Sequence, residues 1–151
     1  EDNSSIIDVC LDSYNFLSSK NKDEITDLLL MQPTSPFRTS KDLKSAISFY
    51  KDNNLKSLAS VSPVIQHPYE IINGTGNKWN SIIEWEGHKN RQKLKNNYYF
   101  INGCFYIINI NYLKENKRIV NLNTYMYQIN GKYSIDIDDY EDFQFANKIL
   151  S

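Results

Sequence analysis

Two aspartates near the end of the sequence are spaced so that they could hold a divalent cation. Asp136 and Asp138 are separated by one residue. In an extended backbone such residues point to the same side, while Ile135 and Ile137 point to the other side, into the core. Two carboxylates held together repel each other unless a cation lies between them, and Mg²⁺ prefers oxygen ligands. The alternative is that acids here only favour the start of a helix, as we expect for Asp139. The alternation favours a magnesium site at the first two aspartates.

A second group of polar side chains follows an apolar run, in the segment LLLMQPTSPFR. Residues 28–31 show no alternation, which is typical of a strand buried on both faces of a parallel sheet. Gln32 has a donor and an acceptor just past the end of this strand, and Ser35 and Arg38 could contact an anionic sugar or a phosphate. Ordinary turn chemistry explains the same residues equally well on composition alone. Because ligands of α/β sheets bind outside the carboxyl ends of the strands, the position of the loop favours a site.

The segment NGCFY contains a third group of candidates. Asn102 and Gly103 interrupt a strong strand pattern, which indicates a β-bulge or a close approach of the backbone to a ligand. Tyr106 follows them and is the tyrosine we single out. Arg91 places a cation beside Gln92 in a basic, polar stretch, where a solvated loop is the ordinary interpretation. The two histidines are isolated and are expected to be structural or on the surface.

The elements that must position these groups alternate in type along the first half of the chain. Helical spacing of apolar residues begins after Ser4 or Ser5, and a second helix is predicted to be capped by Ser40. Between the two helices lies the strand at 28–31, and a further strand is predicted at 57–63. Strand, helix and strand in this order indicate a βαβ unit.

The second half of the chain is richer in strand signals. The remaining elements are predicted as a hairpin around 73–76, a strand within 99–109, a short helix capped by an asparagine near 109, a strand at 124–129, and a last helix over 139–150 with Phe143, Ala146, Ile149 and Leu150 facing inward. Residues 66–98 therefore form a β-rich excursion within an α/β domain.

Bulk composition excludes several classes of protein. The 151 residues suit one domain, and 17 basic against 18 acidic side chains give a formal net charge of −1. This balance does not favour nucleic acid as a partner, and no apolar run approaches the length of a membrane span. The two cysteines lack metal-ligand spacing, and the first residues lack a signal-peptide pattern. The composition points to the cytoplasm.

Five segments together resemble one enzyme family. LLLMQPTSPFRT, HPY, RQ, NGCFYI and SIDIDDYEDFQFA occur in the order and approximate spacing of the acylneuraminate cytidylyltransferases. The resemblance implies a Rossmann-like nucleotidyltransferase of three layers. It also implies that the anomeric hydroxyl of a nonulosonic acid, such as sialic acid, attacks the α-phosphate of CTP and releases pyrophosphate. The alternatives are a related nucleotidyltransferase for legionaminic acid, pseudaminic acid or another sugar, and a truncated, non-catalytic dimerising chain.

The resemblance also implies roles for individual residues. Asp136 and Asp138 correspond to the aspartates that hold Mg²⁺ in the family, and Gln32 corresponds to the glutamine that contacts the sugar acid. Asn102 and Tyr106 correspond to residues that line the sugar pocket.

Further implications concern the partner and the extent of the chain. Arg91 and Gln92 correspond to a pair on a swapped segment that reaches the partner's site, so we expect a homodimer with residues 66–98 as its dimerisation excursion. Residues 1–151 are expected to be the C-terminal two-thirds of the family's domain, since the family's nucleotide-binding loop precedes the helix that opens this chain.

Overall fold

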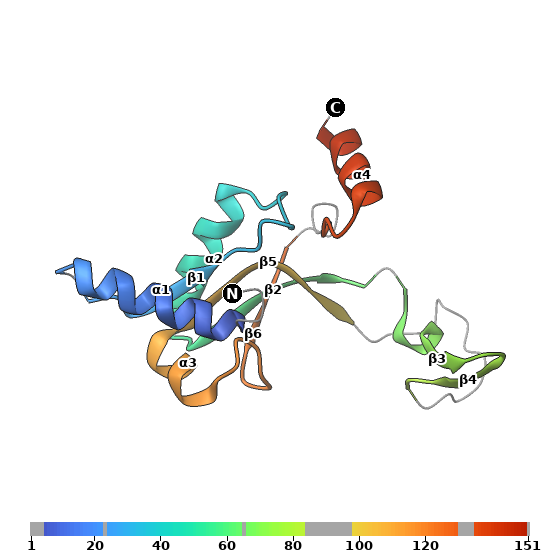
Figure 1. Ribbon diagram of the computed structural model, residues 1–151, viewed down its shortest axis with the longest axis horizontal. Helices are drawn as coiled ribbons and strands as arrows, with labels where there is room; N and C mark the ends of the chain where they lie inside the picture. Colours follow the sequence, from blue (N-terminus) through green and yellow to red (C-terminus); the bar gives the residue numbers. More distant parts are fainter. Residues whose placement is uncertain (1–4, 23, 65, 84–97, 130–134, 151) are drawn as a thin grey trace.

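The structure is a computed structural model that describes residues 5–22, 24–64, 66–83, 98–129 and 135–150 (Figure 1). Its helices and strands follow the predicted order closely. They are α1 (Ile6–Lys20), β1 (Asp27–Leu30), α2 (Ser40–Asp52), β2 (Ser57–Pro63), the 3₁₀ helix η1 (Pro68–Glu70), β3 (Ile72–Thr75), β4 (Lys78–Ser81), β5 (Tyr99–Asn109), α3 (Ile110–Asn116), β6 (Tyr125–Gln128) and α4 (Tyr140–Leu150).

The main sheet is mixed rather than parallel. Its four strands lie in the order β1-β5-β2-β6. β1 and β2 each pair antiparallel with β5, and β6 pairs parallel with β2, so β1, β2 and β6 run in one direction and β5 in the other. The predicted strand–helix–strand unit is present as β1, α2 and β2. Its two strands are parallel, but β5 lies between them in the sheet.

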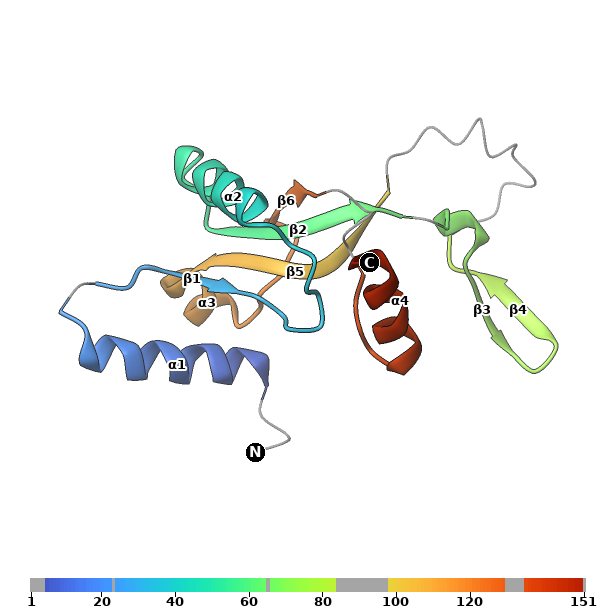
Figure 2. The ribbon, with the colours of Figure 1, turned by 90° about the horizontal axis from the view of Figure 1, so that it is seen from above.

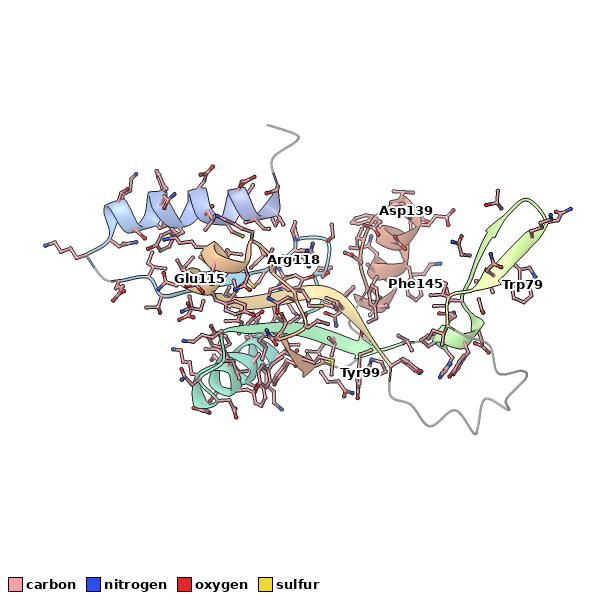
Figure 3. All side chains as sticks on the ribbon, turned by 90° about the horizontal axis from the view of Figure 1, so that it is seen from below. Trp79, Tyr99, Glu115, Arg118, Asp139 and Phe145 are labelled. Atoms are coloured by element: carbon pink, nitrogen blue, oxygen red, sulfur yellow. The ribbon has the colours of Figure 1, made fainter. Side chains whose placement is uncertain are left out.

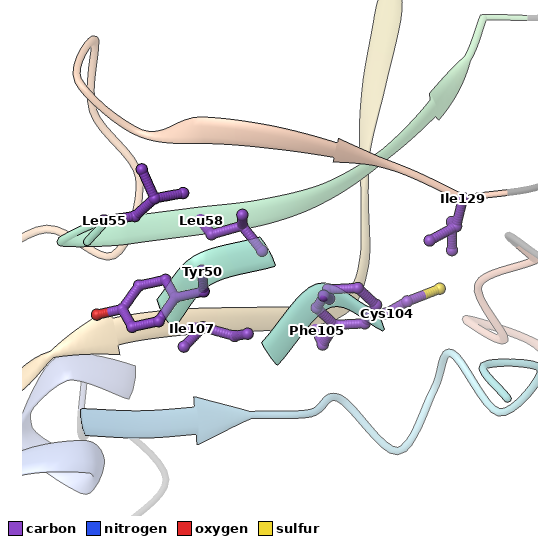
Figure 4. Packing of buried hydrophobic residues seen from close by; sticks show 8 residues of the cluster. Tyr50, Leu55, Leu58, Cys104, Phe105, Ile107 and Ile129 are labelled. Carbon is purple, nitrogen blue, oxygen red and sulfur yellow. The ribbon is translucent and has the colours of Figure 1, made fainter. Parts of the chain in front are cut away.

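Helices cover both faces of this sheet. Successive residues of β5 point to opposite faces, so Ile107 and Ile108 belong to two different clusters of buried side chains. Ile107 packs with Tyr50 of α2, in the cluster that Figure 4 shows beside β2 and β5. Ile108 packs with Cys10 of α1 and Leu113 of α3. Figure 2 shows α2 on one side of the sheet and α1 and α3 on the other, which confirms the α/β class.

Local capping signals explain where the first two long helices begin. The Ser5 side chain accepts a hydrogen bond from the amide of Asp8, as predicted from the sequence. At α2, however, the capping residue is Thr39 and not Ser40. The Thr39 hydroxyl accepts from the amide of Asp42, whose carboxylate accepts from the Thr39 amide in return, and this reciprocal pair fixes the helix start one residue earlier.

The prediction that residues 28–31 are buried on both faces is wrong for this chain. Leu28 and Leu30 pack against the cluster that contains Cys10 of α1 and Leu113 of α3. Leu29 and Met31 are 37% and 41% exposed. β1 is an edge strand among the described residues. The cluster that includes Tyr50 of α2 contains residues of β2 and β5 and none of β1. Leu29 and Met31 therefore lie on a face of β1 that the described residues do not cover.

Two elements stand apart from the main sheet. β3 and β4 form the predicted hairpin, a separate two-stranded sheet whose turn contains Gly76 at a positive φ of +61°. Figure 1 shows this hairpin and α4 projecting away from the four-stranded sheet. Ala146 of α4 is buried as predicted, but Phe143 and Ile149 are 49% and 39% exposed, so the prediction that they face inward is wrong. The side chain of Leu150 lies outside the described part. No described helix is both long and apolar enough to cross a membrane.

Candidate active site

The loop after β1 is braced by its own arginine. Nη1 of Arg38 donates a hydrogen bond to the backbone oxygen of Gln32 at 2.8 Å and another to the backbone oxygen of Ser35. The amide of Ser35 also donates to the oxygen of Gln32, at 3.3 Å. The guanidinium thus satisfies carbonyls that a tight loop would otherwise leave without donors. The Ser35 side chain is completely buried and anchors the middle of the loop in the protein, whereas Pro33 and Pro36 are exposed.

β5 meets this loop at a bulge. Asn102 is 2% exposed, and its backbone oxygen lies 3.2 Å from the Ser35 hydroxyl. Gly103 has a φ of +69°, and a Cβ built on it would overlap Oε1 of Gln32. The Gln32 side chain therefore rests directly on the Cα of Gly103, where only a residue without a side chain leaves room. The predicted bulge at the Asn-Gly pair is confirmed by the shift of register between β2 and β5.

Asp136 joins the same group from the far end of the chain. Its Oδ1 lies 3.4 Å from the Ser35 hydroxyl, which donates either to this carboxylate or to the Asn102 carbonyl. The amide of Ile137 donates to the backbone oxygen of Thr34 at 2.8 Å, so the segment before α4 is anchored on the loop after β1. Three segments distant in sequence thus bring Gln32, Ser35, Asn102 and Asp136 together.

The remaining acids separate into two kinds. Asp139 acts at the start of α4, as predicted, together with Asp142. The Asp139 carboxylate accepts from the Asp142 amide, and the Asp142 carboxylate accepts from the Asp139 amide. Asp138 is exposed, and only its backbone amide takes part, donating to Asp142. Its carboxylate is left available on the surface beside the site.

The charge of Asp136 reaches two neighbours on β5. The pKa of Tyr106 is raised, first by burial and then by the negative charge of Asp136. The pKa of the Cys104 thiol is also raised, mainly by burial, with the Arg38 guanidinium opposing this effect and Asp136 adding to it. Both groups are therefore protonated at neutral pH. The neutral Tyr106 phenol can donate or accept a hydrogen bond beside the cluster.

The donor set fits magnesium better than a transition metal. The described residues contain no group of three or more histidine, cysteine and acidic side chains that could enclose a metal ion. Mg²⁺ is commonly held by one or two carboxylates, with waters and substrate phosphates completing its shell. Asp136 is half-buried and Asp138 is exposed, and neither has an ion pair in the part of the chain that the structure describes. Two carboxylates without an ion pair are within the number that commonly holds Mg²⁺.

Two of the predicted site residues, Arg91 and Gln92, lie outside the described residues. Ser60 of β2 donates to Oδ1 of Asn102 at 2.6 Å, although nothing in the sequence singled it out. Its neighbours Ser57 and Ser62 are also buried serines on the same strand. Only the position of the bulge on the neighbouring strand distinguishes Ser60 from them.

The chain is similar to curated enzymes, although no family model matches it. It is 31% identical over 136 residues to an N-acylneuraminate cytidylyltransferase of Streptococcus agalactiae, an alignment that covers 87% of this chain and 32% of that enzyme. It is 30% identical over 133 residues to the CMP-N,N'-diacetyllegionaminic acid synthase of Legionella pneumophila, covering 82% of this chain and 53% of that protein. The chain thus spans about a third to a half of the length of these relatives. These similarities support the resemblance of the chain to the acylneuraminate cytidylyltransferases.

Proposed function

We propose that the protein containing this chain transfers CMP from CTP to a nonulosonic acid, giving a CMP-sugar and pyrophosphate. The observation that carries the proposal is the convergence of Gln32, Asn102 and Asp136 on the buried Ser35, at the carboxyl end of β1. The names of the two relatives agree with such a transfer. The sialic acid and the diacetyllegionaminic acid of those names are the two substrates we rank first.

Each residue of the cluster has a task in this proposal. The Gln32 amide, held against Gly103, and the amide of Asn102 bind oxygens of the sugar acid and orient its anomeric hydroxyl towards the α-phosphorus. Tyr106 keeps its phenolic proton and offers a further hydrogen bond at the edge of the sugar. Arg38 acts on the shape of the loop through its carbonyl contacts. Ser35 ties the loop to β5 and to Asp136.

Asp136 and Asp138 would hold Mg²⁺, which would neutralise phosphate charge as pyrophosphate leaves. The arginine at position 91, paired with Gln92, is proposed to bind the carboxylate of the sugar acid, for which a guanidinium is well suited. Because phosphoryl transfer requires mainly positioning and charge neutralisation, the proposal needs no covalent intermediate on the protein.

We further propose that the protein acts as a homodimer in the cytoplasm, where CTP is available. The support is a set of exposed apolar side chains on the two elements that stand apart from the sheet. Ile72 and Trp79 of the hairpin are 52% and 51% exposed, and Phe143 and Phe145 of α4 are 49% and 56% exposed. Figure 3 shows Trp79 and Phe145 on these elements. Large exposed apolar groups of this kind are typical of interaction surfaces. Residues 66–98 would contain the dimerisation segment.

The experiment is an assay of pyrophosphate release by the full-length protein, with CTP, GTP or UTP and a panel of nonulosonic acids and sugar phosphates. We expect turnover with CTP and a nonulosonic acid only. Asp136→Asn should lower kcat by about 100-fold or more, because it removes a charged metal ligand while keeping the size of the side chain. Asp12→Asn, an exposed change on α1, is the matched control and should leave the rate unaltered. Full activity of Asp136→Asn would refute the metal assignment, and turnover only with a hexose phosphate would refute the substrate class.

A further inference from the structure

Ser60 lies opposite the bulge that carries the candidate site. β2 and β5 pair at Ala59 with Tyr106 and again at Val61 with Ile101. The two residue steps from Ala59 to Val61 on β2 therefore lie opposite five residue steps on β5 (106 − 101). The regular ladder of backbone hydrogen bonds is interrupted between these two pairs. Ser60 is the one residue of β2 inside this gap, and its side chain is completely buried.

The Ser60 hydroxyl replaces the interrupted ladder. Its Oγ accepts a hydrogen bond from the amide of Phe105 at 3.0 Å and donates one to Oδ1 of Asn102 at 2.6 Å. A hydroxyl can accept and donate at the same time, which a side chain such as alanine or valine cannot do. The two bonds join the two ends of the bulge through one oxygen atom.

These contacts fix which way the Asn102 amide faces. Oδ1 also accepts a hydrogen bond from the backbone amide of Cys104, at 3.2 Å. A backbone N–H can only donate, so this side of the amide must be the oxygen, and the other side is the NH₂ group. Nδ2 of Asn102 is buried and has no hydrogen-bond partner among the described residues. A buried donor without an acceptor is costly, so its persistence points to an acceptor supplied by a ligand.

We propose that Ser60 is a positioning residue of this site, whose hydroxyl holds the Asn102 amide so that Nδ2 is directed to an oxygen of the sugar acid. This inference rests on the proposed function and adds to it a residue that does not contact the substrate. Without the Ser60 hydroxyl, Oδ1 loses its shortest hydrogen bond and the bulge loses the link between its ends. Only the longer hydrogen bond from the Cys104 amide then holds Oδ1, so the Asn102 amide is less firmly oriented towards the substrate.

The test compares Ser60→Ala with Ser57→Ala in the full-length protein. Ser57 is a matched control, because it is a buried serine of the same strand whose hydroxyl bonds the Ile119 carbonyl and the Thr124 hydroxyl, away from the bulge. We expect Ser60→Ala to raise KM for the sugar acid about tenfold, the effect of one lost hydrogen bond, with KM for CTP unchanged. Ser57→Ala should change neither. In an Asn102→Ala background, Ser60→Ala should have no further effect on KM.

Ser60→Cys, which keeps the size of the side chain but is a much weaker donor, covers the case in which Ser60→Ala does not fold. It should raise the same KM. A second readout does not require turnover: the side-chain amide signals of Asn102 in a ¹⁵N spectrum, assigned by their loss in Asn102→Ala, should shift in Ser60→Cys and stay in place in Ser57→Ala.

The possible failures are distinguishable. If the wild type turns over no nonulosonic acid, the proposed function falls, and the substrate role of the amide falls with it. If the wild type is active but the Ser60 and Ser57 variants alter the sugar-acid KM equally, the positioning role alone is wrong. Unshifted Asn102 amide signals in Ser60→Cys would overturn it as well.

Discussion

Gly103→Ala is the substitution that tests the arrangement of the site most directly. The new Cβ would overlap Oε1 of Gln32 and lie 3.2 Å from its Cδ and 3.4 Å from Oγ of Ser35. The backbone at this position has a φ of +69°, in the left-handed region that favours glycine. The change therefore has two effects, one on the backbone of β5 and one on the side chain of Gln32.

The two effects differ in what they alter. The left-handed backbone costs an alanine about 1–2 kcal/mol, which lowers the free energy of unfolding. The overlap involves the end of a flexible side chain, so the Gln32 amide moves aside and adds little to this cost. It must nevertheless move by about 1 Å, and a displacement of this size at a group that orients substrate lowers kcat/KM by about 100-fold.

Urea unfolding and the pyrophosphate assay measure the two effects separately. Gly76→Ala is the control for backbone strain, because Gly76 has a φ of +61° and, apart from its chain neighbours, no atom of the described residues lies within 4 Å of an added Cβ. It should keep kcat/KM within about twofold of the wild type, since a strained turn alone displaces no site group. In a Gln32→Ala background, Gly103→Ala should cause no further loss of activity. A folded Gly103→Ala variant with wild-type kcat/KM would refute the reasoning.

Two further predictions concern groups whose pKa is raised in the folded chain. The Tyr50 hydroxyl donates to Asp27 at 2.6 Å, and burial, this bond and the charge of Asp27 raise its pKa well above the usual value of 10.0. The native state therefore keeps a proton that the unfolded chain loses, so this contribution to stability is complete below about pH 10 and falls as the pH rises further. Urea unfolding of Tyr50→Phe should give a free energy of unfolding about 1.5–3 kcal/mol lower than that of the wild type at neutral pH. Above pH 10 this free energy should fall less steeply with pH in Tyr50→Phe than in the wild type, and an equal slope would contradict the role of Tyr50. Burial also raises the pKa of Cys10 and Cys104, so neither thiol should react quickly with a disulfide reagent before the protein is unfolded, and rapid reaction of the native protein would show that the thiols are accessible.

Features that depend on neighbours in sequence were predictable from the sequence. The hairpin turn at Gly76 and the bulge at Gly103 both need a backbone with positive φ, which glycine provides at little cost. The start of α4 was predictable for the same reason, since Asp139 and Asp142 bond each other's amides within one turn. At α4 the interaction that fixes the structure lies within a few residues of the signal, and at the two glycines the signal is the freedom of the residue's own backbone.

Features that depend on distant pairing were not predictable. No pattern in 99–109 indicates that β5 inserts antiparallel between β1 and β2, because a buried strand has the same apolar sequence in either direction. The role of Ser60 depends on which residue of β5 lies opposite, and that register exists only after the strands have paired. A sequence with several buried serines on one strand does not distinguish the one that faces a bulge.

The loop after β1 shows why the choice between turn chemistry and a site could not be made from composition. Arg38 supports the turn interpretation, since its Nη1 bonds the carbonyls of Gln32 and Ser35. Those bonds hold the backbone of Gln32 in the position from which its side chain reaches Gly103 of β5. The same residues thus form the turn and position the Gln32 side chain at the candidate site, so the two interpretations are compatible. Because the Arg38 guanidinium is already engaged by these two carbonyls, we expect it to act on the substrate through the position of Gln32.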